Sequence, residues 1–193
     1  MKQSWAFVLL AVTSLGIAAP SRAASSQSDM LTALGASGPH PAFAQAKAFD
    51  GVIGTWEFDG TLTPEGSPAE QYRGEWTFDW VLDGTAIQDV ITAYPRGAPQ
   101  GQKGTSLRYF DRKHGYWRVL FIVPLSGKVI DLHGGQVGER IVLEGVDVTG
   151  ALLRWSFNDM QPDSFLWRGE TSSDGGRSWR VEQVMKLRRK HAS

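Results

Sequence analysis

The chain has 193 residues, with 20 basic side chains against 20 acidic ones and no cysteine. This neutral balance excludes a general electrostatic attraction to nucleic acid or anionic lipid, so neither is an expected partner. The lack of cysteine excludes disulfides, lipid attachment of the lipoprotein type and a cysteine nucleophile, so the core must stabilise the fold.

Residues 1–24 have the pattern of a secretory signal peptide. A basic residue precedes an apolar run from Trp5 to Ala19, and the small-residue site Ser21-Arg22-Ala23 follows. The run is shorter than the roughly 20 residues that a membrane-spanning helix needs, so we expect cleavage after Ala23 or Ala24. The sequence therefore predicts a periplasmic or secreted protein with no membrane span after cleavage.

Two short segments follow the cleavage site. Residues 25–40 are rich in Ser, Gly and Ala, which is typical of a flexible leader. In residues 41–50, a proline in first-turn position precedes Phe43, Ala46 and Phe49 at helical spacing. This spacing predicts one short helix at the start of the folded domain.

From residue 51 onward, apolar and polar residues alternate. Turn-forming stretches such as LDGT, DRKHG and SDGGR separate apolar runs, and about nine turns delimit roughly ten strands. No connection has room for a crossover helix, and closure removes the exposed edges of a sheet. The sequence therefore predicts an all-β domain over residues 41–189, an antiparallel up-and-down β-barrel of about ten strands with one short N-terminal helix, and a tail at 190–193.

Alternation also predicts which side chains face the interior. In QYRGEWTFDW, Tyr72, Trp76, Phe78 and Trp80 share one face, opposite charged and polar residues. The same rule predicts further inward side chains: Trp117, Trp155, Trp167, Trp179, Val181 and Gln183. Residues 116–123 are apolar on both faces apart from Arg118, which predicts cover on both sides, with the N-terminal helix as the candidate.

The segment SSDGGRSWR, residues 172–180, contains an Asp-box-like pattern known from sialidases and other β-propellers. A propeller needs several blades of about four strands each, so this chain is too small for one. We interpret the segment as a turn in which Asp174 bonds the backbone, Gly176 adopts positive φ and Trp179 packs at the start of the next strand.

GTWEFDG, residues 54–60, carries the Gly-x-Trp found at the start of lipocalin and calycin barrels. That resemblance implies that a terminal arginine, Arg188, packs over Trp56 and closes the barrel bottom. With residues 162–189, the chain resembles an exported bacterial lipocalin-like family of unknown function. The architecture is more distantly similar to nitrobindins, ten-stranded barrels that bind haem through a histidine, although their longer glycine-rich first-strand signature is missing here.

The sequence offers little for catalysis or metal binding. The four histidines show no ligand spacing, and there is no Gly-x-Ser-x-Gly elbow. His133 is the one candidate for a haem or metal ligand, and its position in the strand points it outward unless a bulge at the following glycines reverses it. Most carboxylates also face outward, which argues against a glycosidase pair. We therefore predict no catalytic site, no metal and no cofactor, with haem as the alternative.

The interior remains as the candidate site, because a barrel of about ten strands leaves a cavity unless large side chains fill it. An inward Gln183 needs a hydrogen-bond partner, for which a ligand, Gln88, Asp89 and Arg108 are candidates. We predict that the barrel binds a small, largely apolar molecule; the alternatives are a filled structural or interaction module and a haem protein using His133. The candidate ligand-binding residues are Trp76, Gln88, Arg108, Trp117, Trp155, Trp167 and Gln183.

Overall fold

The computed structural model describes residues 22–43, 46–97 and 99–191. The chain divides into two compact units, of which the second begins at Ala33, and most of helix α1 (Arg22–Leu34) belongs to the first. The predicted leader is thus helical as far as Leu34, whereas the predicted signal peptide lies almost entirely outside the described residues. Within the described ranges, no helix combines the length and apolar character needed to cross a membrane.

The segment predicted as one short helix forms two 3-10 helices, η1 (Pro41–Phe43) and η2 (Lys47–Val52). A further 3-10 turn, η3 (Pro124–Ser126), follows the fifth strand. In η2 the apolar residues Phe49 and Val52 are completely buried. Burial of this short segment in the barrel, rather than helix propensity, therefore fixes its conformation.

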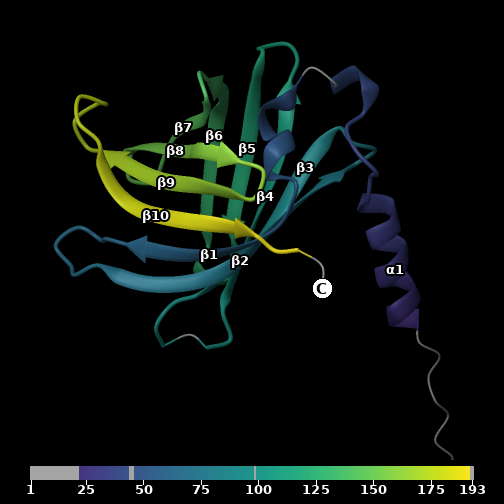
Figure 1. Ribbon diagram of the computed structural model, residues 1–193, viewed down its shortest axis with the longest axis horizontal. Coiled ribbons are helices and arrows are strands. Elements are labelled where there is room, and N and C mark those ends of the chain that lie inside the picture. The colour runs from purple at the N-terminus through teal and green to yellow at the C-terminus, as the bar shows by residue number, and fades with distance from the viewer. Residues whose placement is uncertain (1–21, 44–45, 98, 192–193) are drawn as a thin grey trace, which may run out of the picture. The chain divides into compact units, whose positions relative to one another are not determined.

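Ten antiparallel strands form a closed barrel, which confirms the predicted fold class (Figure 1). Each strand pairs with the next, and β10 pairs with β1, so the ring has no free edge. The strands are β1 (Gly54–Leu62), β2 (Glu70–Val81), β3 (Ala86–Tyr94), β4 (Gln102–Asp111), β5 (Tyr116–Val123), β6 (Lys128–Val137), β7 (Arg140–Val146), β8 (Leu152–Gln161), β9 (Ser164–Ser172) and β10 (Arg180–Arg189).

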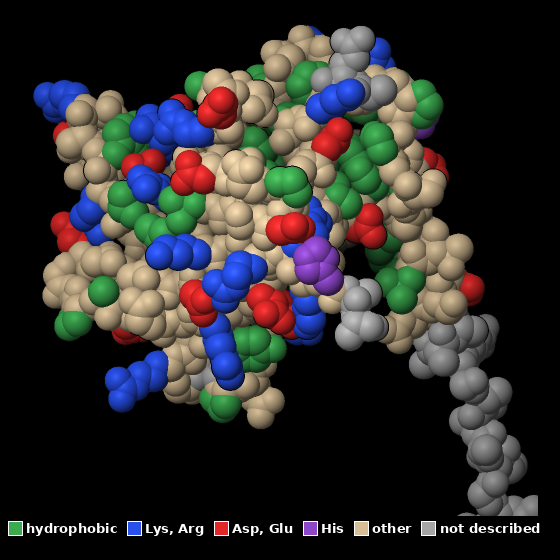
Figure 2. All heavy atoms as spheres, in the orientation of Figure 1, with side chains coloured by type: hydrophobic (Ala, Val, Ile, Leu, Met, Phe, Trp, Pro, Cys, Tyr) green, Lys and Arg blue, Asp and Glu red, His purple; other side chains and the backbone are tan. Residues whose placement is uncertain are grey.

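The predicted inward faces are confirmed along most strands. In β2, Trp76, Phe78 and Trp80 are buried while the intervening residues are exposed. The same alternation buries Trp56 and Phe58 in β1 and Phe165 and Trp167 in β9. On the outside, acidic and basic side chains are interspersed over the face that Figure 2 shows, rather than gathered into one charged patch.

Two predicted inward residues lie on the outside instead. A bulge between Val181 and Gln183 shifts the pairing of β10 with β9, and Val181 is 37% exposed. Trp179 packs against the outward-facing Arg154, whose guanidinium carbon lies 3.7 Å from the ring centroid. The predicted face of Trp179 and Val181 is wrong because the extra residue of the bulge reverses the alternation.

The predicted double cover of residues 116–123 is also wrong among the described residues. Trp117 and Val119 are buried in the barrel, but Leu120 is 44% exposed on its outer surface. Leu107, its partner on β4, is also exposed. The apolar residues on this outer face therefore have solvent, rather than a covering helix, on one side.

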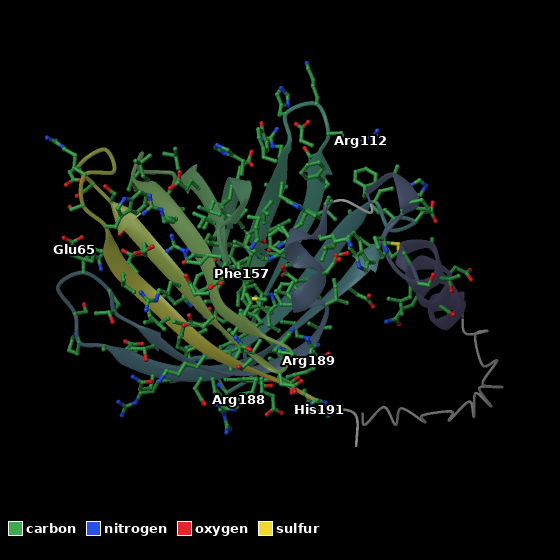
Figure 3. The ribbon with its side chains drawn as sticks, turned by 45° about the horizontal axis from the view of Figure 1, so that its top comes forward. Glu65, Arg112, Phe157, Arg188, Arg189 and His191 are labelled. Carbon is green, nitrogen blue, oxygen red and sulfur yellow. The ribbon has the colours of Figure 1, made fainter. Side chains whose placement is uncertain are left out.

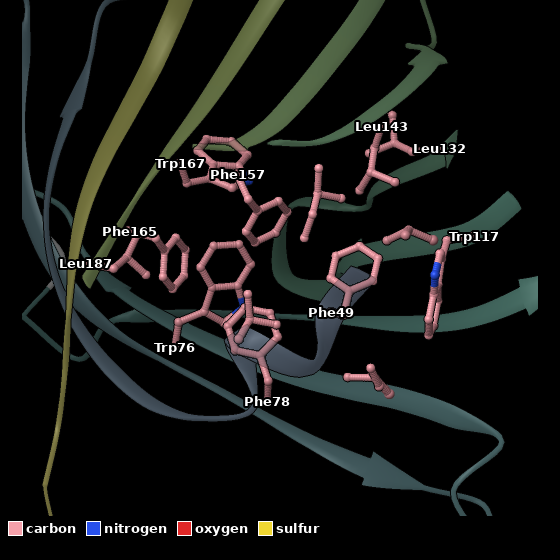
Figure 4. Packing of buried hydrophobic residues seen from close by; sticks show 14 of the residues in the cluster. Phe49, Trp76, Phe78, Trp117, Leu132, Leu143, Phe157, Phe165, Trp167 and Leu187 are labelled. Carbon is pink, nitrogen blue, oxygen red and sulfur yellow. The ribbon is translucent and has the colours of Figure 1, made fainter. Parts of the chain in front are cut away.

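One end of the barrel is filled by its own side chains. Phe49 of η2 contacts Trp117 and Phe157 edge to face, with ring centroids 5.0 Å and 5.7 Å away (Figure 4). The indole Nε1 of Trp56 donates to the Val52 carbonyl over 2.8 Å, which anchors η2 to β1. This end is called the closed half below.

Candidate functional site

The other end of the barrel holds a pocket of about 780 Å³, called the open half below. Residues from the turns β1–β2, β5–β6, β7–β8 and β9–β10 surround its mouth. The first and last of these turns lie side by side, and Glu65 marks the tip of the first (Figure 3). Deeper inside, the walls are aromatic or aliphatic: Trp76, Ile91, Phe121, Trp155, Trp167 and Met185.

Three tryptophans from three strands form a continuous wall. Trp167 of β9 lies between Trp76 and Trp155, with ring centroids 6.2 Å and 5.4 Å away and both contacts edge to face. Phe121 extends the wall, 5.2 Å from Trp155. Such edge-to-face contacts hold large rings in fixed orientations, so the pocket presents flat apolar surfaces to a ligand.

The mouth of the pocket is polar and net acidic. Its lining includes two cationic side chains, Lys128 and Arg180, against four acidic ones, so the formal balance is 2 − 4 = −2. Arg180 donates to the Thr63 carbonyl over 3.1 Å and pairs with Glu182, which links the β1–β2 turn to β10. The acidic side chains are Glu65, Asp147, Glu170 and Glu182.

Gln183 finds its partner within the barrel. Its side-chain amide donates to the hydroxyl of Tyr72 on β2. Gly60 lies opposite Tyr72 and leaves room for its ring, since a Cβ at Gly60 would overlap that ring. Burial raises the pKa of Tyr72 to about 12, and the bond from Gln183 opposes this increase.

The closed half contains a buried ion pair that does not reach the pocket. Arg108 of β4 donates to Asp89 of β3, and both side chains have no exposed surface. Asp89 also accepts the backbone N–H of Ser106 over 3.0 Å. The Arg108 guanidinium carbon lies 5.3 Å and 4.9 Å from the ring centroids of Phe49 and Phe78. Arg108 therefore belongs to the packing around η2.

The structure brings together only part of the predicted ligand-binding set. Trp76, Trp155, Trp167 and Gln183 line the pocket. Arg108 and Trp117 face inward but pack in the closed half, and Gln88 lies on the opposite face of β3 from Asp89, where it donates to the Thr105 hydroxyl over 3.2 Å. For these three, the expectation that they line the cavity is wrong, because η2 fills one end of the barrel and β3 directs Gln88 outward.

Phe121 and Ile91 line the pocket but were not among the candidates. Phe121 shares its face of β5 with the buried Trp117 and Val119, so strand alternation could have identified it. Ile91 lies directly opposite Trp76 across the β2–β3 pair, a register that the sequence does not show.

His133 lies on the outer surface, as its strand position predicts. Its ring is exposed and lies 5.4 Å from the Tyr116 ring, and His114 stacks on the same tyrosine at 5.6 Å. His133 does not line the pocket. Across the described ranges, no group of three side chains is arranged to hold a metal ion.

The barrel bottom is closed by Arg189 and not by Arg188. The Arg189 guanidinium carbon lies 4.1 Å from the Trp56 ring, and this side chain donates to the carbonyls of Ile53 and Pro162 over 2.8 Å and 2.7 Å. Arg188 points outward and pairs with Asp59 (Figure 3). The assignment of this contact to Arg188 is wrong by one residue, because Arg189 shares the inward face of Met185 and Leu187.

The Asp-box-like segment forms a turn between β9 and β10. Asp174 accepts the Ser178 hydroxyl and backbone N–H over 2.7 Å and 2.9 Å, and it also accepts the Ser172 hydroxyl. These bonds lower the pKa of Asp174 to about 2, with the Ser178 hydroxyl contributing most. Gly176 has φ of +86°. The predicted turn is therefore confirmed.

No family model matches the chain, and no curated protein matches it. Among solved structures, the chain is similar to Rv2717c from M. tuberculosis, with a TM-score of 0.60 and 17% identity, over 79% of this chain and 99% of that one. It is also similar to the S-type phycobiliprotein lyase CPES from Guillardia theta, with a TM-score of 0.54 and 11% identity, over 75% and 92% of the two chains. A de novo designed fluorescence-activating β-barrel aligns with a TM-score of 0.38 and 16% identity, over 75% and 98%. The first two likenesses show a shared β-barrel fold.

Proposed function

We propose that the protein binds a small, largely apolar molecule in the open half of its barrel and does not convert it chemically. The observation that carries this proposal is the wall formed by Trp76, Trp167 and Trp155 around a pocket of about 780 Å³. Small-molecule sites commonly enclose roughly 300–1,000 Å³ and have mostly apolar walls with few polar groups. The pocket has the size and the chemistry of such a site.

The structural neighbours support this proposal at the level of the fold. Closed antiparallel barrels of this width enclose ligand cavities in many proteins, but a fold alone does not determine a ligand. The alternative of a structural barrel filled by its own side chains fits the closed half, where Phe49 packs against Trp117 and Phe157. It does not account for the open half.

We also propose that the protein is exported, on the pattern of residues 1–24. N-terminal sequencing of the mature protein tests this, with Ala24 or Ser25 as the expected first residue. A chain that retains Met1 contradicts the proposal.

Native mass spectrometry with an absorption spectrum, on protein purified gently from its own compartment, tests binding. A reproducible extra mass that Trp155→Ala loses and Trp179→Ala keeps supports the proposal, because Trp155 lines the pocket and Trp179 packs outside it. An absorption band in the Soret region would favour the haem alternative instead. An apoprotein mass, together with tryptophan emission that a panel of lipids, porphyrins and aromatic compounds leaves unchanged, contradicts ligand binding.

A further inference from the structure

Gln183 places a polar side chain at the edge of the aromatic wall of the pocket. It shares the inward face of β10 with the buried Met185 and Leu187, and it lines the pocket. Its partner on β9 is Gly169, and the Trp167 ring approaches this glycine so closely that a Cβ there would lie 2.8 Å from the ring. The same Cβ would lie 3.6 Å from Cβ of Gln183. The amide therefore stands next to Trp167.

One end of this amide is held by Tyr72. Nε2 of Gln183 donates to the Tyr72 hydroxyl, and β1 lies between the strands of these two residues. The Tyr72 ring packs edge to face against Phe58, with centroids 5.7 Å apart, and it occupies the space that Gly60 leaves. A tyrosine held on two sides fixes the orientation of the amide, so Oε1 is the end left for another partner.

Oε1 of Gln183 is an unpaired acceptor with accessible surface. Among the residues that the structure describes, no donor bonds it, and it is not one of the fully buried atoms without a partner, which belong to Trp76, Trp167, Arg108 and Ser106. Because the side chain faces inward and is only half-buried, this surface opens into the pocket. A purely apolar ligand that covered the oxygen would displace its water and offer no hydrogen bond in return.

The surroundings of Gln183 favour a neutral donor. Glu182, the preceding residue, is paired with Arg180, and Glu65 is 87% exposed at the tip of its turn. An ammonium group beside Gln183 would exchange its hydration for one neutral amide oxygen, which is a costly exchange. A hydroxyl or a neutral N–H group donates to the same oxygen with a far smaller loss of hydration.

We propose, on the basis of the binding function above, that the ligand is a neutral aromatic compound with a hydrogen-bond donor, such as an alcohol, a phenol or an N–H heterocycle, and that this donor binds Oε1 of Gln183. The aromatic body packs against the wall that Trp155, Trp167 and Phe121 form. This ligand class is narrower than an apolar molecule in general.

Four pyrenes with substituents of matched size test this inference. They are 1-pyrenemethanol, which donates and accepts, 1-pyrenecarbaldehyde, which only accepts, 1-ethylpyrene, which does neither, and 1-pyrenemethylamine, which is a cation. Energy transfer from the tryptophans to the bound pyrene gives the affinities. Each affinity is expressed relative to that of 1-ethylpyrene in the same protein, so that changes in the apolar contact cancel.

We expect Gln183→Met to lower the relative affinity for 1-pyrenemethanol about tenfold and to leave that for 1-pyrenecarbaldehyde unchanged. The matched control is Gln88→Met, which makes the same replacement where the side chain bonds Thr105 and does not line the pocket. Gln88→Met should preserve all the relative affinities.

A crystal structure of the parent protein with 1-pyrenemethanol does not depend on a variant folding correctly. It should place the hydroxyl oxygen within about 3.0 Å of Oε1 of Gln183. A hydroxyl bound elsewhere, or relative affinities that Gln183→Met leaves unchanged, overturns the inference and leaves the proposed apolar site intact.

The other two compounds test the nature of the donor. An equal fall in the relative affinity for 1-pyrenecarbaldehyde in Gln183→Met would mean that the amide presents its nitrogen to the pocket, which overturns the assignment of a donor to the ligand. A larger fall for 1-pyrenemethylamine than for 1-pyrenemethanol overturns the choice of a neutral ligand. No binding by any of the four compounds overturns both proposals.

Discussion

Arg108 and Asp89 pair with each other inside the barrel, where neither side chain has any exposed surface. They lie on neighbouring strands, and the Arg108 guanidinium packs against Phe49 and Phe78 at the closed half. Moving two charges out of water is costly, and only their mutual attraction and further hydrogen bonds offset the loss. The stability of the closed half therefore depends on keeping both partners.

Removing one partner should destabilise the protein strongly. We expect Arg108→Met to lower the free energy of unfolding by about 3–5 kcal/mol, because it leaves the Asp89 charge buried and unpaired. The double variant Arg108→Met with Asp89→Leu should lose clearly less unfolding free energy than Arg108→Met alone, because it leaves no unpaired buried charge. Urea unfolding gives the free energy of unfolding of the parent protein, the single variant and the double variant.

An exposed pair provides the control for this experiment. Arg188 and Asp59 lie 2.8 Å apart with side chains 62% and 65% exposed, so Arg188→Met should cost less than about 1 kcal/mol. If Arg108→Met costs no more than Arg188→Met, burial of the first pair does not govern the stability of the closed half.

Arg189 provides a second prediction, because its guanidinium joins three segments at the barrel bottom. It packs on Trp56 and donates to carbonyls at Ile53 and Pro162. Lysine keeps the charge but cannot match this planar arrangement of donors, so Arg189→Lys should lower the unfolding free energy by about 1–3 kcal/mol. Arg188→Lys, at the next residue, should have little effect in the same unfolding assay, and equal losses for the two variants would contradict the assignment.

Strand alternation was sufficient to predict the barrel and much of the pocket. Trp76 and Trp155 have polar residues on both sides in their strands, Trp167 is followed by Arg168, and each faces inward as that pattern indicates. The turn at Asp174 was also predictable, because its bonding partners lie within a few residues. These features depend on local sequence, which a single chain displays directly.

The remaining features depend on contacts between distant segments. Asp89 is a charged residue that faces inward only because Arg108 neutralises it from the neighbouring strand, so its polarity alone indicates the wrong face. The bulge at Val181 and the insertion of Phe49 into the barrel are likewise settled by packing. Arg189 differs, because its alternation with Leu187 already pointed to the correct residue.

The turn at Asp174 leads to a prediction at low pH. The hydrogen bonds from Ser178 and Ser172 lower its pKa from the ordinary 3.8 of an aspartate to about 2, so the folded turn favours the carboxylate. The stabilisation is therefore present above about pH 4 and is lost as the pH falls through about 2. Ser178→Ala removes the largest cause and should raise the pKa of Asp174, as measured by NMR titration of the side-chain carboxyl group.

Asp147 is the internal control for that titration. Its pKa is lowered chiefly by the Thr149 hydroxyl in a different turn, so Ser178→Ala should leave it unchanged. If the Asp174 titration does not move in Ser178→Ala, the hydroxyl bond is not what lowers its pKa.

Tyr72 leads to the opposite prediction, at high pH. Burial raises its pKa from 10.0 to about 12, so the folded barrel favours the neutral phenol. The stabilisation is fully present below about pH 10 and is lost as the pH rises through about 12. Between these two values, the unfolding free energy should fall by at most about 1.4 kcal/mol for each pH unit. In chemical unfolding, Tyr72→Phe should show a smaller loss of stability across this interval than the parent protein.

The phenolate absorbance difference between the parent and Tyr72→Phe isolates this one titration, with an expected midpoint near pH 12. Gln183→Leu should move the midpoint higher, since the bond from Gln183 opposes the effect of burial. A midpoint close to 10 in the parent would contradict this assignment. It would mean that water reaches the Tyr72 hydroxyl, so that burial does not raise its pKa.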